Sequence, residues 1–353
     1  MIKPLTSLRF FFAFFVFLSH LSYLKENKNY KDLFEVFFSE GFLGVSFFFI
    51  LSGFILALNY RNKFINKKIT LKKFYIARLA RIYPLHFITL LFSISAFYSG
   101  YKNLLYNALL LQSYIPNSKI FFSYNAPSWS ISDEMFFYTL FPALVINISK
   151  LSKYFKILIL AAFIFVVIFL NITLLDEVKA HYWLYISPFV RIFDFILGIL
   201  LFEVIIYLKN TSPKLKQSLF NFLEIGGFII LVILLTFHDN IPVHYRFSIY
   251  YWLPMCMIIL GASSSFIYTK TTTWTSKVLS WKCLVYLGEI SFAFYMTHYL
   301  VLAYTNNLNW LIGLHPKNLS YGVEMFIITL VVSIFSFEFL EKPLNNKIKN
   351  LFP

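Results

Sequence analysis

Charged side chains are scarce in this sequence. Only 13% of its 353 residues are Asp, Glu, Lys or Arg, whereas 59% are hydrophobic. Soluble domains carry about 25% charged residues, so a soluble globular fold is excluded. We therefore expect an all-α, polytopic membrane protein. Marking apolar stretches of about 20 residues predicts ten membrane spans. They lie near 6–24, 37–58, 83–100, 129–147, 157–175, 186–208, 220–237, 248–267, 283–304 and 321–341.

The sequence also has few cysteines, and it shows no internal repeat and no sign of a cleavable leader. The two cysteines, Cys256 and Cys283, are not in CxxC spacing, so neither a metal site nor a disulfide framework is indicated. The N-terminus has one Lys and no small-residue cleavage site, so 5–24 is interpreted as a retained helix. No repeat of fixed period is found, which weakens an inverted-repeat transporter interpretation. We expect one transmembrane domain over 1–353 and no fused soluble domain.

Acidic residues number 16 against 31 basic ones, a formal net charge of +15. Such an excess can indicate nucleic-acid binding, but its distribution favours a membrane topology. With a cytoplasmic N-terminus, 21 Lys and Arg residues fall on the inner side of the predicted spans and 8 on the outer side. This asymmetry follows the positive-inside rule and predicts that both termini are cytoplasmic. The basic inner loop 59–82 is interpreted as an anchor on anionic lipid.

Polar residues inside the spans are the exceptions that indicate function. The first span, LTSLRFFFAFFVFLSH, carries Arg9 and His20 eleven residues apart, on one helix face and roughly 16 Å apart along the axis. If neither residue has a function, the Arg9 side chain extends to the lipid headgroups on the inner side and His20 lies at the membrane interface. Glu134 and His298 come to a depth similar to that of His20 from two other spans, which predicts a polar site in the membrane. Asp133 is expected to cap its helix at the surface.

Two further groups of residues have both a structural and a functional interpretation. Ser52 and Gly53 belong to a small-residue face, which suits close helix packing. The functional alternative is that Gly53 lets a ligand approach the backbone. Arg191 and Asp194 are spaced i, i+3, so the simplest interpretation is an ion pair on one helix face.

The segment before the third predicted span, RLARIYP, places Arg78 and Arg81 on one helical face, followed by Pro84. Two guanidinium groups suit a phosphate or lipid headgroups equally well. The outer segment 101–128 contains an apolar stretch too short to span, which predicts an interfacial or re-entrant helix.

Seven motifs follow one another along the chain. They are LTSLRFFFAFFVFLSH at 5–20, FFILSGF at 48–54, RLARIYP at 78–84, WSISDEMFFY at 129–138, RIFDFILG at 191–198, LGEISFAFYMTH at 287–298 and the late FEFLEKPL. In this order they resemble membrane acyltransferase family 3, whose bacterial members O-acylate surface glycans, and the resemblance covers about residues 5–344. Two dipeptides depart from the common pattern of the family, since Thr6-Ser7 occupies the place of Asp-Gly and Met135-Phe136 the place of Glu-Gln.

The resemblance implies a role for each matching residue. His20 is the catalytic histidine, and Glu134 is the acidic residue of its motif. The cytoplasmic acyl-donor side is implied for Arg9, Arg78, Arg81, Ser52 and Gly53. A role in binding the acceptor, or in supporting the residues that do so, is implied for His298, Trp129, Ser132, Arg191 and Asp194.

The resemblance also implies a reaction, in which acyl-CoA, most often acetyl-CoA, donates from the cytoplasm to a glycan hydroxyl outside. The acceptor is O-antigen, capsule, exopolysaccharide or peptidoglycan, and the location is the bacterial inner membrane. No bound cofactor, metal or nucleic acid is expected. Either the hydroxyl attacks the thioester directly, or the enzyme first takes the acyl group in an acyl-enzyme intermediate. Alternatively, the chain passes the acyl group to a separate periplasmic or extracellular partner, which completes the transfer. The competing interpretations are a proton-coupled transporter or flippase, and a structural partner in glycan assembly.

Overall fold

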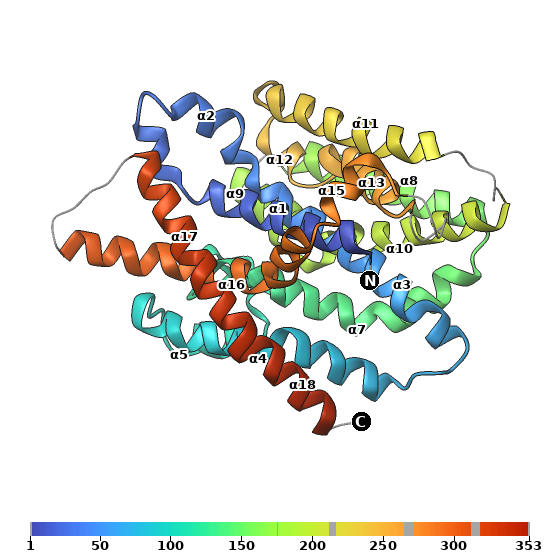
Figure 1. The fold of residues 1–353 in the computed structure, drawn as a ribbon, viewed down its shortest axis with the longest axis horizontal. Helices are drawn as coiled ribbons and strands as arrows, with labels where there is room; N and C mark the ends of the chain where they lie inside the picture. Colours follow the sequence, from blue (N-terminus) through green and yellow to red (C-terminus); the bar gives the residue numbers. More distant parts are fainter. Residues whose placement is uncertain (1, 175, 212–216, 265–271, 312–317, 352–353) are drawn as a thin grey trace. The chain divides into compact units, whose positions relative to one another are not determined.

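The computed structural model describes residues 2–174, 176–211, 217–264, 272–311 and 318–351. In these ranges the chain is helical and contains no β-strand, as the all-α prediction requires (Figure 1). The helices divide between two compact units. Unit 1 comprises 1–12, 42–68 and 140–289, and unit 2 comprises 13–41, 69–139 and 290–353. Three helices contribute residues to both units: α1 (Lys3–Ser19), α7 (Trp129–Lys150) and α16 (Lys282–Leu311).

The other elements each lie wholly or mainly in one unit. Unit 1 contains α3 (Leu43–Ile65), α8 (Lys153–Thr173), α9 (Glu177–His181), η5 (Tyr182–Ile186), α10 (Pro188–Thr211), α11 (Gln217–Thr236), η6 (His238–Asn240), α12 (Val243–Arg246), η7 (Ile249–Tyr251), α13 (Trp252–Ala262) and α15 (Trp274–Leu279). Unit 2 contains η1 (Ser22–Glu26), α2 (Lys31–Val36), η2 (Phe38–Phe42), α4 (Leu71–Ala96), α5 (Tyr101–Ala108), η3 (Gln112–Tyr114), α6 (Ser118–Phe121), η4 (Ala126–Ser128), α17 (Leu319–Ser336), η8 (Phe337–Glu341) and α18 (Lys342–Leu351).

Six stretches among the described residues are long and apolar enough to cross a membrane. They are Lys31–Ile65, Leu71–Ala96, Ala126–Lys150, Lys153–Thr173, Gln217–Thr236 and Leu319–Leu351. At the other four predicted spans the structure has the helices α1, α10, α13 and α16. The number ten and the cytoplasmic termini stay predictions. Of the predicted spans, residues 175 and 265–267 lie outside the described residues.

The prediction of a long loop over 59–82 is wrong, because the connection between the two helices is much shorter. α3 continues to Ile65 and α4 begins at Leu71, so only 66–70 separate the two helices. The side chain of Thr70 caps α4 by accepting a hydrogen bond from the Lys73 N–H at 3.2 Å. Pro84, which follows the two arginines, lies inside α4. Of the basic residues that suggested a loop, only Lys67 and Lys68 lie between the helices, and the others belong to the end of α3 and the first half of α4.

Close packing of glycines joins α3 to α10 in unit 1. A Cβ atom on Gly53 would lie 1.9 Å from the carbonyl oxygen of Phe195, and one on Gly198 would lie 1.9 Å from that of Ile50. Each glycine thus leaves space for the backbone of the other helix. The packing interpretation of the small-residue face accounts for Gly53.

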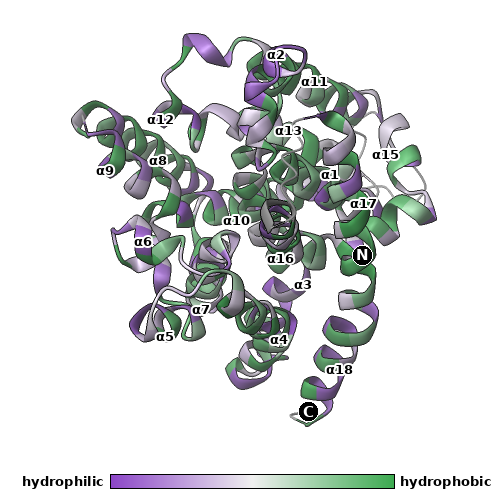
Figure 2. Cartoon of the chain, turned by 90° about the vertical axis from the view of Figure 1, so that its left-hand side faces the viewer, coloured by the Kyte–Doolittle hydropathy of each residue, from purple (hydrophilic) through white to green (hydrophobic). Residues whose placement is uncertain are grey.

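In unit 2, polar side chains join the short helices of 101–128 to the start of α7. Gln112 Nε2 donates to the Ser128 carbonyl at 3.0 Å, and Ser113 Oγ donates to Ser132 Oγ at 2.7 Å. The eight-residue helix α5 is too short to span, as predicted for this segment. At the other end of the unit, hydrophilic and hydrophobic residues alternate along α18 (Figure 2).

Candidate active site

The structure brings His20 and His298 together in unit 2. His20 directly follows the last residue of α1, and His298 lies in α16. Their ring centroids are 5.0 Å apart, and Nδ1 of His20 lies 3.4 Å from Nε2 of His298. His298 is fully buried, whereas His20 is half-buried. We call these two residues the histidine pair.

Backbone carbonyls determine which nitrogen of each ring carries the proton. His20 Nδ1 lies 2.9 Å from the carbonyl oxygen of Val16, and His298 Nδ1 lies 2.6 Å from that of Tyr295. A carbonyl oxygen only accepts hydrogen bonds, so Nδ1 is the protonated nitrogen in both neutral rings. His298 Nε2 then accepts a share of the His20 Nδ1–H. His20 Nε2 keeps its lone pair and is the basic nitrogen of the histidine pair.

The start of α7 is tied to the helix that carries His298. Ser130 Oγ and Tyr295 Oη are 2.8 Å apart, and Asn125 Nδ2 donates to the carbonyl of Met296 at 2.9 Å. Of the predicted residues on this segment, Trp129 is 3% exposed and Ser132 fully buried. Asn125 and Tyr295 were missed by the sequence reasoning. Their positions in NAPSW and FAFYMTH, beside predicted residues, were the only signal.

Glu134 contacts Tyr138, whose ring in turn lies near Arg78, one of the predicted donor-side arginines. It accepts a hydrogen bond from Tyr138 Oη, one turn further along α7. The guanidinium of Arg78 lies 5.7 Å from the centroid of the Tyr138 ring. Glu134 is half-buried and Asp133 fully buried. The predicted surface capping role of Asp133 is therefore wrong, because η4 and the preceding short helices cover the first turn of α7.

Arg81 forms an ion pair with Glu341, and its guanidinium lies 5.7 Å from the Phe292 ring centroid. Glu341 is the second glutamate of FEFLEKPL and is only 2% exposed. The pair joins α4 to η8, 260 residues apart in the sequence. The structure thus gives Arg81 a protein partner, and phosphate binding by Arg78 and Arg81 stays a prediction.

Arg191 and Asp194 form the predicted ion pair in unit 1, with Nη1 and Oδ2 3.0 Å apart and both side chains buried. Arg191 also donates from Nη1 to the Phe247 carbonyl at 2.7 Å and from Nη2 to Ser46 Oγ at 2.8 Å. Trp252 Nε1 donates to the Asp194 carboxylate. Such buried charges require both a counter-ion and hydrogen bonds, and this arrangement supplies them.

The remaining predicted donor residues lie in unit 1. Arg9 is half-buried in α1, and Ser52 is half-buried in α3 beside Gly53. Their grouping with the arginines of unit 2 stays a prediction. In the ranges that the structure describes, no group of three His, Cys, Asp or Glu side chains could hold a metal ion.

Comparison with known protein families identifies the class. A family model described as an acyltransferase domain matches residues 3–338, nearly the whole chain. The chain therefore belongs to the acyltransferase 3 family, as its motifs predicted, and is a multi-pass membrane protein of that family.

Several curated proteins are similar to the chain. It is 28% identical over 292 residues to the acyltransferase MdmB of Streptomyces mycarofaciens, covering 76% of this chain and 70% of that protein. It is 25% identical to the peptidoglycan O-acetyltransferase OatA of Listeria monocytogenes, covering 86% of this chain and 51% of OatA. The putative O-acetyltransferase SACOL0978 of Staphylococcus aureus is 24% identical, with coverage of 86% and 52%. The chain thus spans about half the length of these two O-acetyltransferases. No solved structure matches it.

Proposed function

We propose that this chain transfers an acyl group, most often acetyl, from cytoplasmic acyl-CoA to a hydroxyl group of an envelope glycan. The donor, the acceptor and the bacterial inner membrane are the expectations that the family resemblance implies. The relatives named as O-acetyltransferases support an oxygen acceptor, and one of them is named for peptidoglycan. The observation that carries the mechanism is the histidine pair, in which a backbone carbonyl and His298 fix the orientation of His20.

In this mechanism His20 Nε2 is the general base. It removes the proton of the acceptor hydroxyl as the hydroxyl oxygen attacks the thioester carbonyl. The carbon–sulfur bond breaks, the acyl–oxygen bond forms, and the thiolate of coenzyme A takes up the proton from His20. An acyl-enzyme path uses the same nitrogen, since Nε2 is also the only ring atom of His20 with a lone pair to attack the thioester. His298 holds the opposite side of the ring in both paths.

The experiment uses purified protein in proteoliposomes supplied with isotope-labelled acetyl-CoA, together with mass spectrometry of envelope glycans from cells that produce each variant. His20→Ala is expected to lower transfer of label by at least about 100-fold, the lower range for loss of a general base. The matched control is His238→Ala. His238 also bonds its own backbone through Nδ1, to the Leu235 carbonyl at 2.7 Å, but lies in unit 1.

Both variants must elute and unfold thermally like the unchanged protein before their activities are compared. Full activity of a folded His20→Ala variant would overturn the assignment of the base. Movement of glycan across the membrane without consumption of acetyl-CoA would favour the transporter interpretation over acyl transfer.

A further inference from the structure

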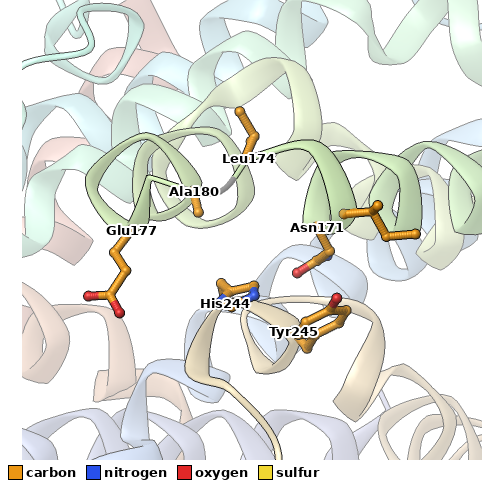
Figure 3. Close-up of a pocket in the computed structure, with 7 residues that line it drawn as sticks. Asn171, Leu174, Glu177, Ala180, His244 and Tyr245 are labelled. Atoms are coloured by element: carbon orange, nitrogen blue, oxygen red, sulfur yellow. The ribbon is translucent and has the colours of Figure 1, made fainter.

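A pocket of about 280 Å³ lies in unit 1, and none of the residues that line it is assigned a catalytic role above. It is formed by the end of α8, the start of α9 and the short helix α12 (Figure 3). Four polar side chains line it, namely those of Asn171, Glu177, His244 and Tyr245. Small-molecule sites are usually about 300–1,000 Å³, so this pocket suits a small ligand. In the predicted topology, the end of α8 is on the outer side of the membrane.

Asn171 supplies an unsatisfied hydrogen-bond acceptor at this site. Its Nδ2 donates to the carbonyl of Val167 at 2.8 Å, and the side chain is only 4% exposed. Its Oδ1 has no hydrogen-bond partner among the described residues and points into the pocket (Figure 3). A buried acceptor without a partner costs free energy, because it has lost its hydrogen bonds to water. A ligand that donates a hydrogen bond to Oδ1 would remove this cost.

The walls of the pocket are held in place by neighbouring contacts. Asp176 caps α9 by accepting hydrogen bonds from the backbone N–H groups of Val178 and Lys179 at 2.9 and 3.1 Å. At the other end of α9, the ring centroid of His181 lies 5.4 Å from that of Phe247, the residue after α12. Burial lowers the pKa of His181, which favours the neutral ring in this contact. Arg191 bonds the Phe247 carbonyl. The buried ion pair therefore positions the segment that carries His244 and Tyr245.

The side chains that line the pocket favour some classes of ligand over others. Glu177 and Asn171 Oδ1 accept hydrogen bonds, while Tyr245 and His244 add polar atoms and ring faces. Among the described residues, no Lys or Arg lines the pocket, and Glu177 would repel a phosphate, so an anionic lipid headgroup is disfavoured. A neutral ligand with several hydroxyl groups matches acceptors beside an aromatic ring.

We propose that this pocket binds one sugar ring of the acceptor glycan. The inference rests on the proposed function for the identity of the glycan, but it concerns binding, not the transfer step. The pocket then contributes to choosing the acceptor, with Asn171 Oδ1 and Glu177 accepting hydrogen bonds from sugar hydroxyls.

The test measures binding of free sugars to the full chain in lipid nanodiscs by saturation-transfer NMR. The probes are glucose, galactose and N-acetylglucosamine, with glycerol 3-phosphate as the probe for a phosphate headgroup. At least one sugar should bind to the unchanged protein. Asn171→Leu and Glu177→Leu each remove the accepting oxygen and should each weaken its binding by about tenfold, the effect of one hydrogen bond of about 1.4 kcal/mol. Thr173→Ala is the matched control, because its hydroxyl bonds the Phe169 carbonyl of its own helix, at 2.8 Å, and it does not line the pocket.

Each other outcome overturns the assignment. Absence of binding by all three sugars would do so, as would unchanged binding in both pocket variants or competition by glycerol 3-phosphate. A His20→Ala variant separates this inference from the proposed function. It should bind the sugar normally while losing acyl transfer. Retained transfer in that variant would refute the proposed base but leave the sugar-binding result standing.

Discussion

The Nδ1–H of His20 is shared between two acceptors, the Val16 carbonyl at 2.9 Å and His298 Nε2 at 3.4 Å. When Nε2 takes a proton, the ring becomes a cation and both hydrogen bonds become charge-assisted. They then strengthen as the reaction proceeds. Interactions that are stronger in the transition state than in the ground state are those that accelerate a reaction. In the proposed mechanism His298 is accordingly a positioning residue for His20, since it would act through the other imidazole.

We predict that His298→Ala lowers kcat by about 10- to 100-fold and changes KM little. This range corresponds to loss of one hydrogen bond to a charged group, about 1.5–3 kcal/mol. His298→Gln should recover part of the activity, because its amide oxygen can accept from His20 Nδ1–H. The measurement is steady-state acyl transfer at varied acyl-CoA concentration.

Thr305→Ala is the control for these variants. Thr305 lies on the same helix, α16, and its hydroxyl bonds the Val301 carbonyl at 2.6 Å. Equal losses in His298→Ala and His298→Gln, or a change confined to KM, would show that His298 only fills space.

Among the elements, α3 and α10 approach each other closely through their glycines. Each helix places a carbonyl oxygen where the other's Cβ would stand. Backbone cannot move aside as the end of a flexible side chain can, so any side chain here would separate the helices. Small residues allow helices to approach in this way when lipid, which is as apolar as leucine, provides no hydrophobic driving force.

Gly53→Ala should therefore destabilise the protein by about 1–3 kcal/mol, the usual cost of overpacking. The measurement is the midpoint of thermal unfolding in detergent, which should fall by a few degrees. Gly226→Ala on α11 is the matched control, because its Cβ would meet only the flexible end of Met257, at 3.3 Å. Equal shifts in the two variants would contradict the assigned contact.

For the whole molecule, the sequence predicted the parts that depend on local pattern. Apolar runs predicted helical segments, and the shared depth of His20, Glu134 and His298 predicted a polar site. The structure brings the two histidine rings to 3.4 Å, and a functional site of all three residues stays a prediction. The predicted start of α4 was wrong, because the run of basic residues resembles a loop. The helix in fact begins at residue 71, directly after a threonine that caps it. The partner of Arg81 was not predictable, since Glu341 is 260 residues away and no local pattern pairs them. The same holds for the pocket that Asn171 lines together with residues of α12, because their proximity depends on packing.

The predicted topology can be tested with single cysteines in a background of Cys256→Ser and Cys283→Ser. Lys28→Cys, between α1 and α3, should react with a membrane-impermeant maleimide on intact spheroplasts. Lys68→Cys, between α3 and α4, should react only after permeabilisation, because the positive-inside rule places this segment in the cytoplasm. The reverse pattern would invert the predicted orientation.

The histidine pair also limits how protons are handled over a complete cycle of the proposed reaction. Two imidazoles whose centroids lie 5.0 Å apart disfavour a second positive charge, so the pair holds one extra proton at most. The proton from each acceptor must therefore leave before the next acceptor reacts, and the departing thiolate consumes it. With the donor inside and the acceptor outside, one acyl group moves outward for each proton that moves inward. The exchange carries no net charge, so the membrane voltage would neither drive nor oppose it.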